Sequence, residues 1–342
     1  MVRGPTVMTP QNTPKRVVSG MRPTGRLHLG HYHGAVKNWI EISRKAECFF
    51  FSADWHALTS EYKDTSKLAE SQREMFADWI AAGLDPERCT LFIQSHVKQH
   101  AELYLLLGMI APLGWLERVP TYKEQQEQLK EKDLNTYGFL GYPVLQTADV
   151  AVYGADAVPV GQDQVSHLEL AREIVRKFNH HYAREKPVLV EPHPYLTDVP
   201  KILGLDGRKM SKSYGNAVEL GEDPESARKR IMVAVTDPAR VRRHDPGHPE
   251  VCPIYWLHKA YSPPETVALV DRECRSAGIG CVDCKKMLLG NLIPSLERHR
   301  AARAELDRNP GRIEELVQLG TRKASAVAEQ TMTAVRDAVK LA

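Results

Sequence analysis

The 342-residue sequence lacks long apolar runs, dense cysteine and any large excess of one charge. Uncharged stretches such as Leu103–Leu116, which contains Pro112, are shorter than the roughly 20 residues that a membrane-spanning helix needs. Six cysteines are too few for a disulfide scaffold, and the Pro-rich residues 1–15 have no apolar core of a signal peptide. A net charge of +3 excludes a histone-like arm but not a local basic face. We therefore expect a cytoplasmic protein with a flexible leader at residues 1–15 and no membrane contact.

The first half of the chain has the pattern of an α/β domain. A hydrophobic content of 42% fits a folded chain with a sizeable core. Short apolar or β-branched runs alternate with amphipathic helical patterns. Strands are expected at Arg16–Ser19, Cys48–Ser52, Thr90–Gln94 and Ala157–Val160. This alternation predicts a doubly wound, parallel, Rossmann-like sheet, whose ligands bind at the carboxyl ends of the strands.

The second half changes character after Asn216, where helical patterns dominate. They cover Pro224–Val235, Pro263–Ser276, Cys281–His299 and Ile313–Val339. Basic residues cluster locally at 228–230 and 240–243. We predict a Rossmann-like domain over residues 16–216 and a second, all-helical domain over residues 217–342.

Two short segments contain residue types suited to a nucleoside triphosphate. Thr24–His31 follows the first expected strand and places His28 and His31 at the entry to a helix, where backbone N–H groups attract phosphate. Gly30 lets a flat ring lie against the backbone. Lys209–Ser213 holds two lysines and hydroxyls in a loop that can close over a triphosphate. Either motif alone is weak evidence for a nucleotide site, but the two motifs in this order indicate two sides of one such site.

These two segments resemble the signatures of class I aminoacyl-tRNA synthetases, which activate an amino acid with ATP and load it onto tRNA. Other segments narrow the resemblance to the bacterial tryptophanyl-tRNA synthetases over about residues 16–300: Ser19–Gly25, Ala53–Thr59, Tyr142–Gln146, Ala148–Asp149 and Val158–Gly161. The resemblance implies L-tryptophan, ATP with Mg²⁺ and tRNA(Trp) as substrates, and a homodimer. It also implies that the helical domain, residues 217–342, binds the tRNA anticodon.

The resemblance also assigns site residues. The expected catalytic group is Thr24, His28, His31, Lys209 and Lys212, which would stabilise charge on the transferring phosphate. Apart from His28, these residues also count as ATP contacts. The other expected ATP contacts are Arg22, Pro23, Gly30, Gly161, Gln162, Asp163, Ile202, Met210, Ser211 and Ser213, with Asp163 near the ribose.

Three polar residues suggest an amino-acid pocket. Tyr142, Gln146 and Asp149 are spaced so that one helix face presents all three. The resemblance implies that Tyr142 and Gln146 hold the α-ammonium group and that Asp149 accepts the indole N–H. Because its neighbours are apolar, we expect Asp149 to be buried and, without the substrate, to lack a partner.

Four cysteines in the second half form a candidate metal site: Cys252, Cys274, Cys281 and Cys284. Two residues separate Cys281 from Cys284, as in a chelating turn. Four thiolates suit either a [4Fe-4S] cluster or tetrahedral Zn²⁺. Some bacterial tryptophanyl-tRNA synthetases carry such a cluster with closely similar spacing, which favours iron–sulfur over zinc. Four ordinary buried thiols are the remaining alternative.

The same residues distinguish this function from three rival functions. Tyrosyl-tRNA synthetases use a similar Tyr/Gln/Asp face, but the segments around Trp55 and Trp115–Arg118 favour tryptophan. A simple adenylyltransferase would not need the long helical half. A catalytically inactive RNA-binding relative is disfavoured because both histidines and both lysines are intact. The resemblance thus implies a tryptophan–tRNA ligase reaction, in which tryptophanyl-adenylate forms and its amino acid then passes to the terminal ribose of tRNA.

Overall fold

The computed structural model describes residues 14–119, 134–161, 165–196, 202–309 and 311–341. Within them lies a five-stranded parallel sheet in the order β3-β2-β1-β4-β5. Its strands are β1 (Arg16–Met21), β2 (Glu47–Ser52), β3 (Cys89–Ile93), β4 (Ala157–Val160) and β5 (His193–Leu196). The predicted parallel α/β sheet is confirmed, and its four expected strands match β1 to β4. The sequence pattern missed β5, a short edge strand that contains a proline.

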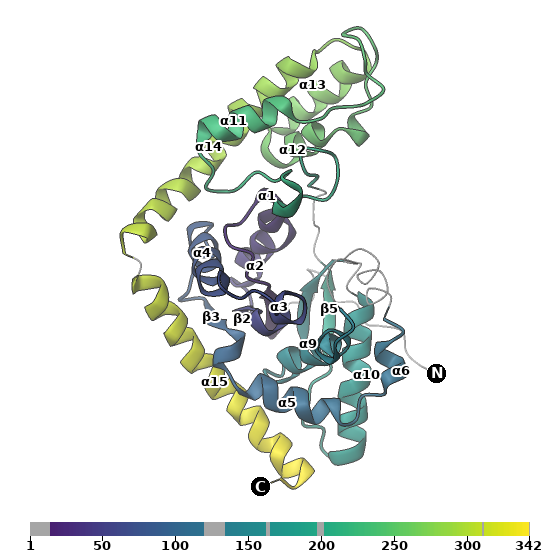
Figure 1. Ribbon diagram of the computed structural model, residues 1–342, viewed down its shortest axis with the longest axis vertical. Coiled ribbons are helices and arrows are strands. Elements are labelled where there is room, and N and C mark those ends of the chain that lie inside the picture. Colours follow the sequence, from purple (N-terminus) through teal and green to yellow (C-terminus); the bar gives the residue numbers. More distant parts are fainter. Residues whose placement is uncertain (1–13, 120–133, 162–164, 197–201, 310, 342) are drawn as a thin grey trace.

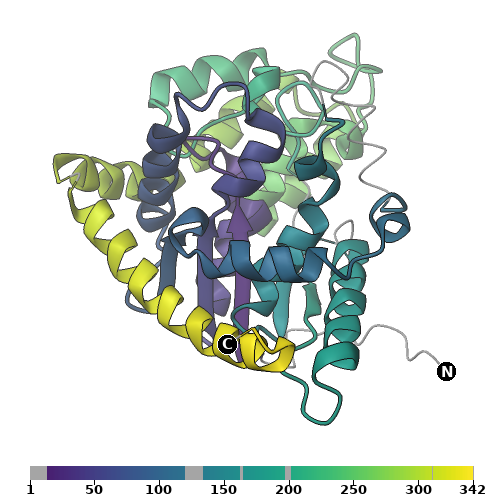
Figure 2. The same cartoon turned by 60° about the horizontal axis from the view of Figure 1, so that its bottom comes forward.

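Helices cover both faces of this sheet (Figures 1 and 2). They are α1 (Leu29–His31), α2 (Lys37–Ile42), α3 (Asp54–Glu61), α4 (Leu68–Ala81), α5 (Gln99–Gly108), α6 (Leu113–Leu116), α8 (Tyr137–Leu140), α9 (Tyr142–Ala151) and α10 (Val165–Tyr182). Successive β1 residues enter different cores: Val17 packs with Trp39 of α2, whereas Val18 packs with Ala148 of α9. This alternation is the expected consequence of side chains pointing to opposite faces of a strand. The order of the sheet reverses between β1 and β4, where ligands bind in open α/β sheets.

The helical segment that follows β1, residues 29–42, contains a π-helical stretch. Residues Tyr32–Val36 form η1 between α1 and α2. Such segments insert an extra residue per turn and occur often at functional sites. Here η1 directly follows the first signature segment.

The second half of the chain is helical, as expected. It contains α11 (Pro224–Val233), α12 (Pro253–Tyr261), α13 (Pro264–Arg275), α14 (Cys281–Arg308) and α15 (Gly311–Val339). Helices α11 to α14 gather at one end of the molecule (Figure 1). Among the described residues, no helix is long and apolar enough to cross a membrane.

The last helix, α15, returns to the sheet instead of staying with α11 to α14 (Figure 1). Its buried residues Ala324, Ala328 and Met332 belong to the same apolar core as Phe49 of β2. At Gly320 a Cβ atom would lie 1.8 Å from the carbonyl oxygen of Leu91 in β3, so only glycine permits this close approach. The C-terminal helix is therefore part of the packing of the first unit.

A buried ion-pair network joins α14 to α4. The Arg303 guanidinium donates to Asp78 Oδ1 at 2.6 Å and to Glu74 Oε2 at 2.7 Å. Asp78, which is 2% exposed, also accepts the Leu27 N–H at 2.6 Å through its other oxygen. One carboxylate of α4 thus holds both α14 and the first signature segment.

We expect Arg303→Met to lower the free energy of unfolding by about 3 kcal/mol, because it leaves the deeply buried Asp78 without its guanidinium partner. Glu74 loses Arg303 as well but keeps its contact with Arg26. Urea denaturation measures this change. The matched control is Arg312→Met, which removes an exposed pair with Glu315 and should change stability by no more than about 0.5 kcal/mol. Similar small losses in both variants would contradict a structural role for the buried network.

Candidate active site

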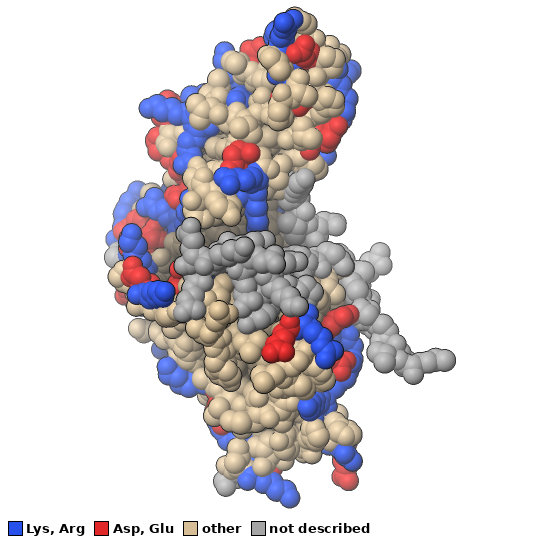
Figure 3. All heavy atoms as spheres, turned by 45° about the vertical axis from the view of Figure 1, so that its right-hand side comes forward, with Lys and Arg blue, Asp and Glu red and all other residues tan. Residues whose placement is uncertain are grey.

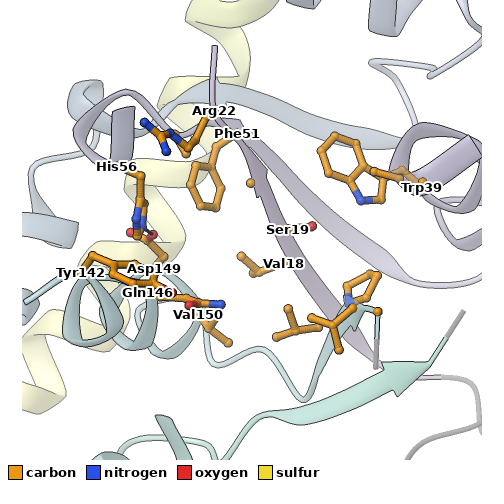
Figure 4. A pocket seen from close by; sticks show the side chains of 18 of the residues that line it. Val18, Ser19, Arg22, Trp39, Phe51, His56, Tyr142, Gln146, Asp149 and Val150 are labelled. Atoms are coloured by element: carbon orange, nitrogen blue, oxygen red, sulfur yellow. Dashed lines mark hydrogen bonds and ion pairs between the residues drawn. The ribbon is translucent and has the colours of Figure 1, made fainter. Parts of the chain in front are cut away.

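A cavity of about 390 Å³ opens over the carboxyl ends of β1 and β4, where the strand order reverses. Figure 4 shows Asp149, Gln146 and Tyr142 on one wall, with His56 beside Asp149 and Trp39 at the opposite end. Ser19, Gly20 and Arg22 from the end of β1 complete the lining together with Gly161 after β4. The cavity therefore occupies the place where the sheet topology predicts a ligand.

The three polar residues that the sequence spacing places on one helix face lie together on α9. Tyr142, Gln146 and Asp149 all line this cavity. The helix begins at Tyr142 with Pro143 in its first turn, a position where the missing N–H of proline costs nothing. The Tyr142 hydroxyl lies 2.8 Å from Nδ1 of His167 in α10, so the phenol is held at the cavity wall. These three polar groups surround a space lined also by apolar side chains such as Phe51 and Val150.

Asp149 is buried as expected, at 1% exposure, but the expectation that it lacks partners is wrong. Its Oδ1 accepts Gln94 Nε2–H at 2.7 Å and lies 2.7 Å from His100 Nδ1. Its Oδ2 lies 2.7 Å from His56 Nε2. Gln94 follows β3 and His56 lies on α3, both far from α9 in sequence, so no spacing along the chain could reveal them.

These partners keep Asp149 ionised. Burial acts to raise the pKa of its carboxyl, but His56 and His100 outweigh burial and lower that pKa to about 2. An ionised carboxylate accepts hydrogen bonds and donates none. Asp149 is therefore suited to an N–H group of a ligand in the cavity.

The two signature segments, far apart in sequence, lie in contact. Leu29 N–H donates to the Val218 carbonyl and Leu220 N–H donates to the Leu27 carbonyl, both at 2.9 Å. The Lys212 ammonium donates to the Thr24 carbonyl at 2.5 Å. Lys212 also lines a second cavity, of about 330 Å³, with Gly25 and Arg26. The fold therefore brings the two segments together, and a shared nucleotide site stays a prediction.

The two histidines of the first segment are stacked, with ring centroids 3.6 Å apart. Burial, and then the nearby Lys212 and Lys209, lower the pKa of His28 to about 4. Burial and His28 lower the pKa of His31 to about 3. Both imidazoles are therefore neutral near pH 7 and act as hydrogen-bonding groups, whereas the lysines supply positive charge.

Gly30 is needed because the His28 ring lies against it. A Cβ atom at Gly30 would come within 3.0 Å of that ring and within 3.3 Å of Met210 Cβ. The His28 Nδ1 atom accepts the His31 N–H at 3.3 Å, so His28 caps the short helix α1. Gly30 and buried Met210 thus pack the two signatures together.

The lysine segment is shaped by a residue that the sequence reasoning did not single out. Asn216, 3% exposed, accepts the Ser211 N–H at 2.7 Å through its side-chain oxygen. Its amide nitrogen donates to Asp206 at 2.7 Å and to the Lys209 carbonyl at 3.1 Å. Ser211 and Ser213 contact each other through their hydroxyls at 2.8 Å. A single buried amide therefore fixes the backbone on both sides of Met210.

The other expected ATP contacts are distributed around the same edge of the sheet. Arg22 lines the cavity, and its guanidinium donates to Ser60 Oγ at 2.5 Å and lies 4.0 Å from Glu61. Pro23 is buried and Thr24 is exposed. Ile202 packs against the apolar core cluster to which Met210 belongs. Gln162 and Asp163 lie outside the described residues.

The four cysteines of the second half come together. Cys252, Cys274, Cys281 and Cys284 line one small cavity of about 20 Å³ among α12, α13 and α14, and all are free thiols. Burial, and then the other three sulfur atoms, raise the pKa of Cys284 to about 12. Among the described residues, no three histidine, cysteine or carboxylate side chains are placed to hold one metal ion.

Arginines of the loop before α12 brace this region. The Arg240 guanidinium lies 3.9 Å from Cys281 Sγ and donates to the Ile279 carbonyl at 2.7 Å. Arg243 donates to the carbonyl of Ala277 at 2.9 Å. These two arginines therefore stabilise the turn that leads into α14.

On the face shown in Figure 3, basic and acidic side chains are interspersed.

Comparison with known proteins places this site in a family. The family of class I tRNA synthetases (W and Y) matches residues 10–296. The tryptophan–tRNA ligases of Thermotoga maritima and Ralstonia nicotianae are 50% and 45% identical, over 95% and 96% of this chain and 99% of each relative.

Solved structures agree with the sequence relatives. Tryptophanyl-tRNA synthetase from Campylobacter jejuni, complexed with ADP and tryptophan, matches with a TM-score of 0.83 at 31% identity, over 95% of this chain and 99% of that chain. Tyrosyl-tRNA synthetase from Archaeoglobus fulgidus, with a TM-score of 0.62 at 23% identity, shares the fold. The near-complete matches and the contact between the two signatures lead to one conclusion: the chain belongs to the tryptophan–tRNA ligases, a family of class I aminoacyl-tRNA synthetases.

Proposed function

We propose that the 390 Å³ cavity binds L-tryptophan, with the indole ring directed to Asp149. The observation that carries this proposal is the buried, ionised carboxylate at the end of the cavity that Tyr142, Gln146 and His56 share. A carboxylate there accepts the indole N–H, while Tyr142 and Gln146 hold the α-ammonium group. The tryptophan carboxylate then points toward the end of β1.

The same proposal places ATP along the two signature segments. Lys209 and Lys212 neutralise the triphosphate, and the neutral His28 and His31 donate hydrogen bonds to it. Thr24 and the backbone around Gly30 complete this group. Arg22, Pro23, Gly161, Gln162, Asp163, Ile202, Met210, Ser211 and Ser213 are the remaining proposed contacts. Mg²⁺ bound to the phosphates would add charge neutralisation.

The reaction follows from this placement. The tryptophan carboxylate oxygen attacks the α-phosphorus of ATP, and the bond to the pyrophosphate leaving group breaks. The ribose hydroxyl at the end of tRNA(Trp) then attacks the carbonyl carbon of the adenylate and releases AMP. The protein contributes positioning and charge stabilisation, and it forms no covalent intermediate.

Amino-acid-dependent exchange of pyrophosphate into ATP tests the proposal. Tryptophan should support exchange, and tyrosine should support it at least 1000-fold less well, because discrimination by a hydrogen-bonding site is about 10⁴-fold or more. Exchange with tyrosine alone would instead select a tyrosine enzyme. If neither tryptophan nor tyrosine supported exchange, the result would contradict both a tryptophan enzyme and a tyrosine enzyme.

The cysteine cavity is the proposed site of a [4Fe-4S] cluster. The donor set fits such a cluster, because four free thiols line one cavity and Arg240 lies within reach of Cys281. A single Zn²⁺ ion, which needs four ligand atoms with its sulfur ligands about 2.3 Å away, is the alternative occupant of the same four thiols. A bound cluster would tie α12, α13 and α14 together and so brace this end of the molecule.

Protein purified without oxygen should contain about four iron atoms per chain, as a [4Fe-4S] cluster requires. Cys281→Ser should lose most of this iron and should reduce tRNA charging or stability more than tryptophan activation. Cys89→Ala, which changes a buried thiol in β3, is the matched control and should keep its iron. One zinc per chain would select the alternative metal, and absence of both metals would leave four plain thiols.

The protein is also proposed to be a homodimer. Apolar side chains are exposed on and after α5 and on α8: Leu105 at 55%, Met109 at 72%, Leu113 at 62% and Tyr137 at 68%. Clustered exposed apolar groups are typical of protein interfaces, and the resemblance to a homodimeric family makes a second copy the proposed occupant.

The double substitution of Leu105 and Met109 by glutamate should convert the dimer to a monomer, because each buried interface would then contain charges without partners. Light scattering after size-exclusion chromatography measures the mass. Substitution of the exposed Val233 and Val241 by glutamate is the matched control and should leave the mass unchanged. A monomeric wild-type protein would contradict the proposal.

The helical half is the proposed tRNA anticodon-binding region, and the cytoplasm is the proposed location. The division at residue 216 stays a prediction. The packing of α15 on the sheet supports α11 to α14 as the tRNA-binding part and supports a grouping of residues after 310 with the first unit. The expected leader at residues 1–15 lies almost entirely outside the described residues.

A further inference from the structure

Two fully buried side chains stand behind Asp149, on the side away from the cavity. His100 of α5 and Tyr153, which follows α9, are both 0% exposed, and neither lines the cavity. His100 Nδ1 lies 2.7 Å from Asp149 Oδ1, and His100 Nε2 lies 2.7 Å from the Tyr153 hydroxyl. The three groups form one continuous hydrogen-bonded chain.

The direction of each hydrogen bond follows from the chemistry of its end group. An ionised carboxylate can only accept, so the Nδ1 atom of His100 carries the proton. In the neutral ring the Nε2 atom then accepts, and the Tyr153 hydroxyl donates to it. Without that hydroxyl, the neutral ring could move its proton to Nε2 and turn a lone pair toward the carboxylate.

The two oxygens of Asp149 are not equivalent. Oδ1 receives both Gln94 and His100, which uses its two lone pairs. Oδ2 receives His56 alone among the described contacts, and His56 itself lines the cavity. One acceptor site on Oδ2 therefore remains for a donor that enters the cavity.

We propose that His100 and Tyr153 are positioning residues for tryptophan recognition, which fix the Asp149 carboxylate so that Oδ2 meets the indole N–H. This inference rests on the proposed function. Tyr153 is itself held by stacking on Phe49 of β2, with ring centroids 4.7 Å apart. The sheet core thus orients a phenol, the phenol sets the imidazole tautomer, and the imidazole orients the carboxylate. Groups that orient the ligands of a bound metal change metal affinity by about 10- to 100-fold, and we expect an effect of the same order here.

The experiment compares tryptophan with its benzothiophene analogue, in which sulfur replaces the indole N–H. The ratio of kcat/KM for the two substrates in pyrophosphate exchange isolates the N–H contact from general damage. Tyr153→Phe should lower this ratio about tenfold and His100→Leu about 100-fold. His100→Asn, whose amide nitrogen can replace Nδ1, should restore much of the ratio. Tyr182→Phe, which changes an exposed phenol, is the matched control and should leave it unchanged.

A second comparison separates positioning from packing. If His100 and Tyr153 act through Asp149, Tyr153→Phe should have no further effect on the ratio in an Asp149→Asn background. Equal losses of activity with both substrates, and so an unchanged ratio, would overturn the inference. If His100→Leu does not fold, Tyr153→Phe decides, because it removes one oxygen atom. Failure of the wild-type enzyme to use tryptophan would refute the proposed function instead, since that result does not depend on any variant.

Discussion

Asp149→Ala is expected to reduce kcat/KM for tryptophan in pyrophosphate exchange by about 1000-fold or more, with a change in KM for ATP of less than about threefold. A site that must hydrogen-bond its substrate loses most of its binding selectivity when the partner is removed. Here the loss is larger than that of one contact, because His56, His100 and Gln94 would keep donors without the carboxylate that they share.

Two controls distinguish a loss of tryptophan binding from a folding defect. Asp156→Asn changes another carboxylate, which accepts the N–H groups of Lys15 and Arg16 at the opposite end of the strands, and it should keep tryptophan selectivity. Thermal unfolding of Asp149→Ala shows whether the variant is folded at the assay temperature. A folded Asp149→Ala protein with exchange close to wild type would mean that Asp149 does not bind the indole.

Lys212→Ala is expected to slow adenylate formation by about 100- to 1000-fold, the usual cost of removing one preorganised group that stabilises transition-state charge. The Lys212 ammonium already lies over the first signature, where it donates to the Thr24 carbonyl. Burial lowers its pKa from the ordinary lysine value, although Glu219 and Asp78 oppose this shift. A partly desolvated cation interacts more strongly with phosphate than one in water.

Single-turnover kinetics and a separate tryptophan titration divide the effect into its parts. The Kd for tryptophan should change less than about twofold, because Lys212 acts on charge that develops on the phosphates. Lys229→Ala removes an exposed lysine of α11 and is the control, with an unchanged rate of adenylate formation. An unchanged rate in Lys212→Ala would remove this lysine from the mechanism.

The sequence determined the elements of the fold that depend on local periodicity. The four strands β1 to β4 and the long helices of the second half follow from runs and spacings within single segments. The shared face of Tyr142, Gln146 and Asp149 follows from helix geometry alone, and all three line one cavity. Edge strand β5 was missed because a short strand with proline leaves no clear period, and neither helix α12 nor the π-helical form of η1 was predicted.

The sequence also predicted the chemistry of the site, since the two signatures and the four cysteines can be recognised by residue type and spacing. Which groups contact these residues depends on how the whole chain folds. Asp149 finds His56, Gln94 and His100 on three other elements, and Asp78 finds Arg303 far along the chain. Burial makes such partners obligatory because an unpaired charge away from water is costly. Local sequence cannot identify these partners, because the folded sheet and its helices bring distant residues together.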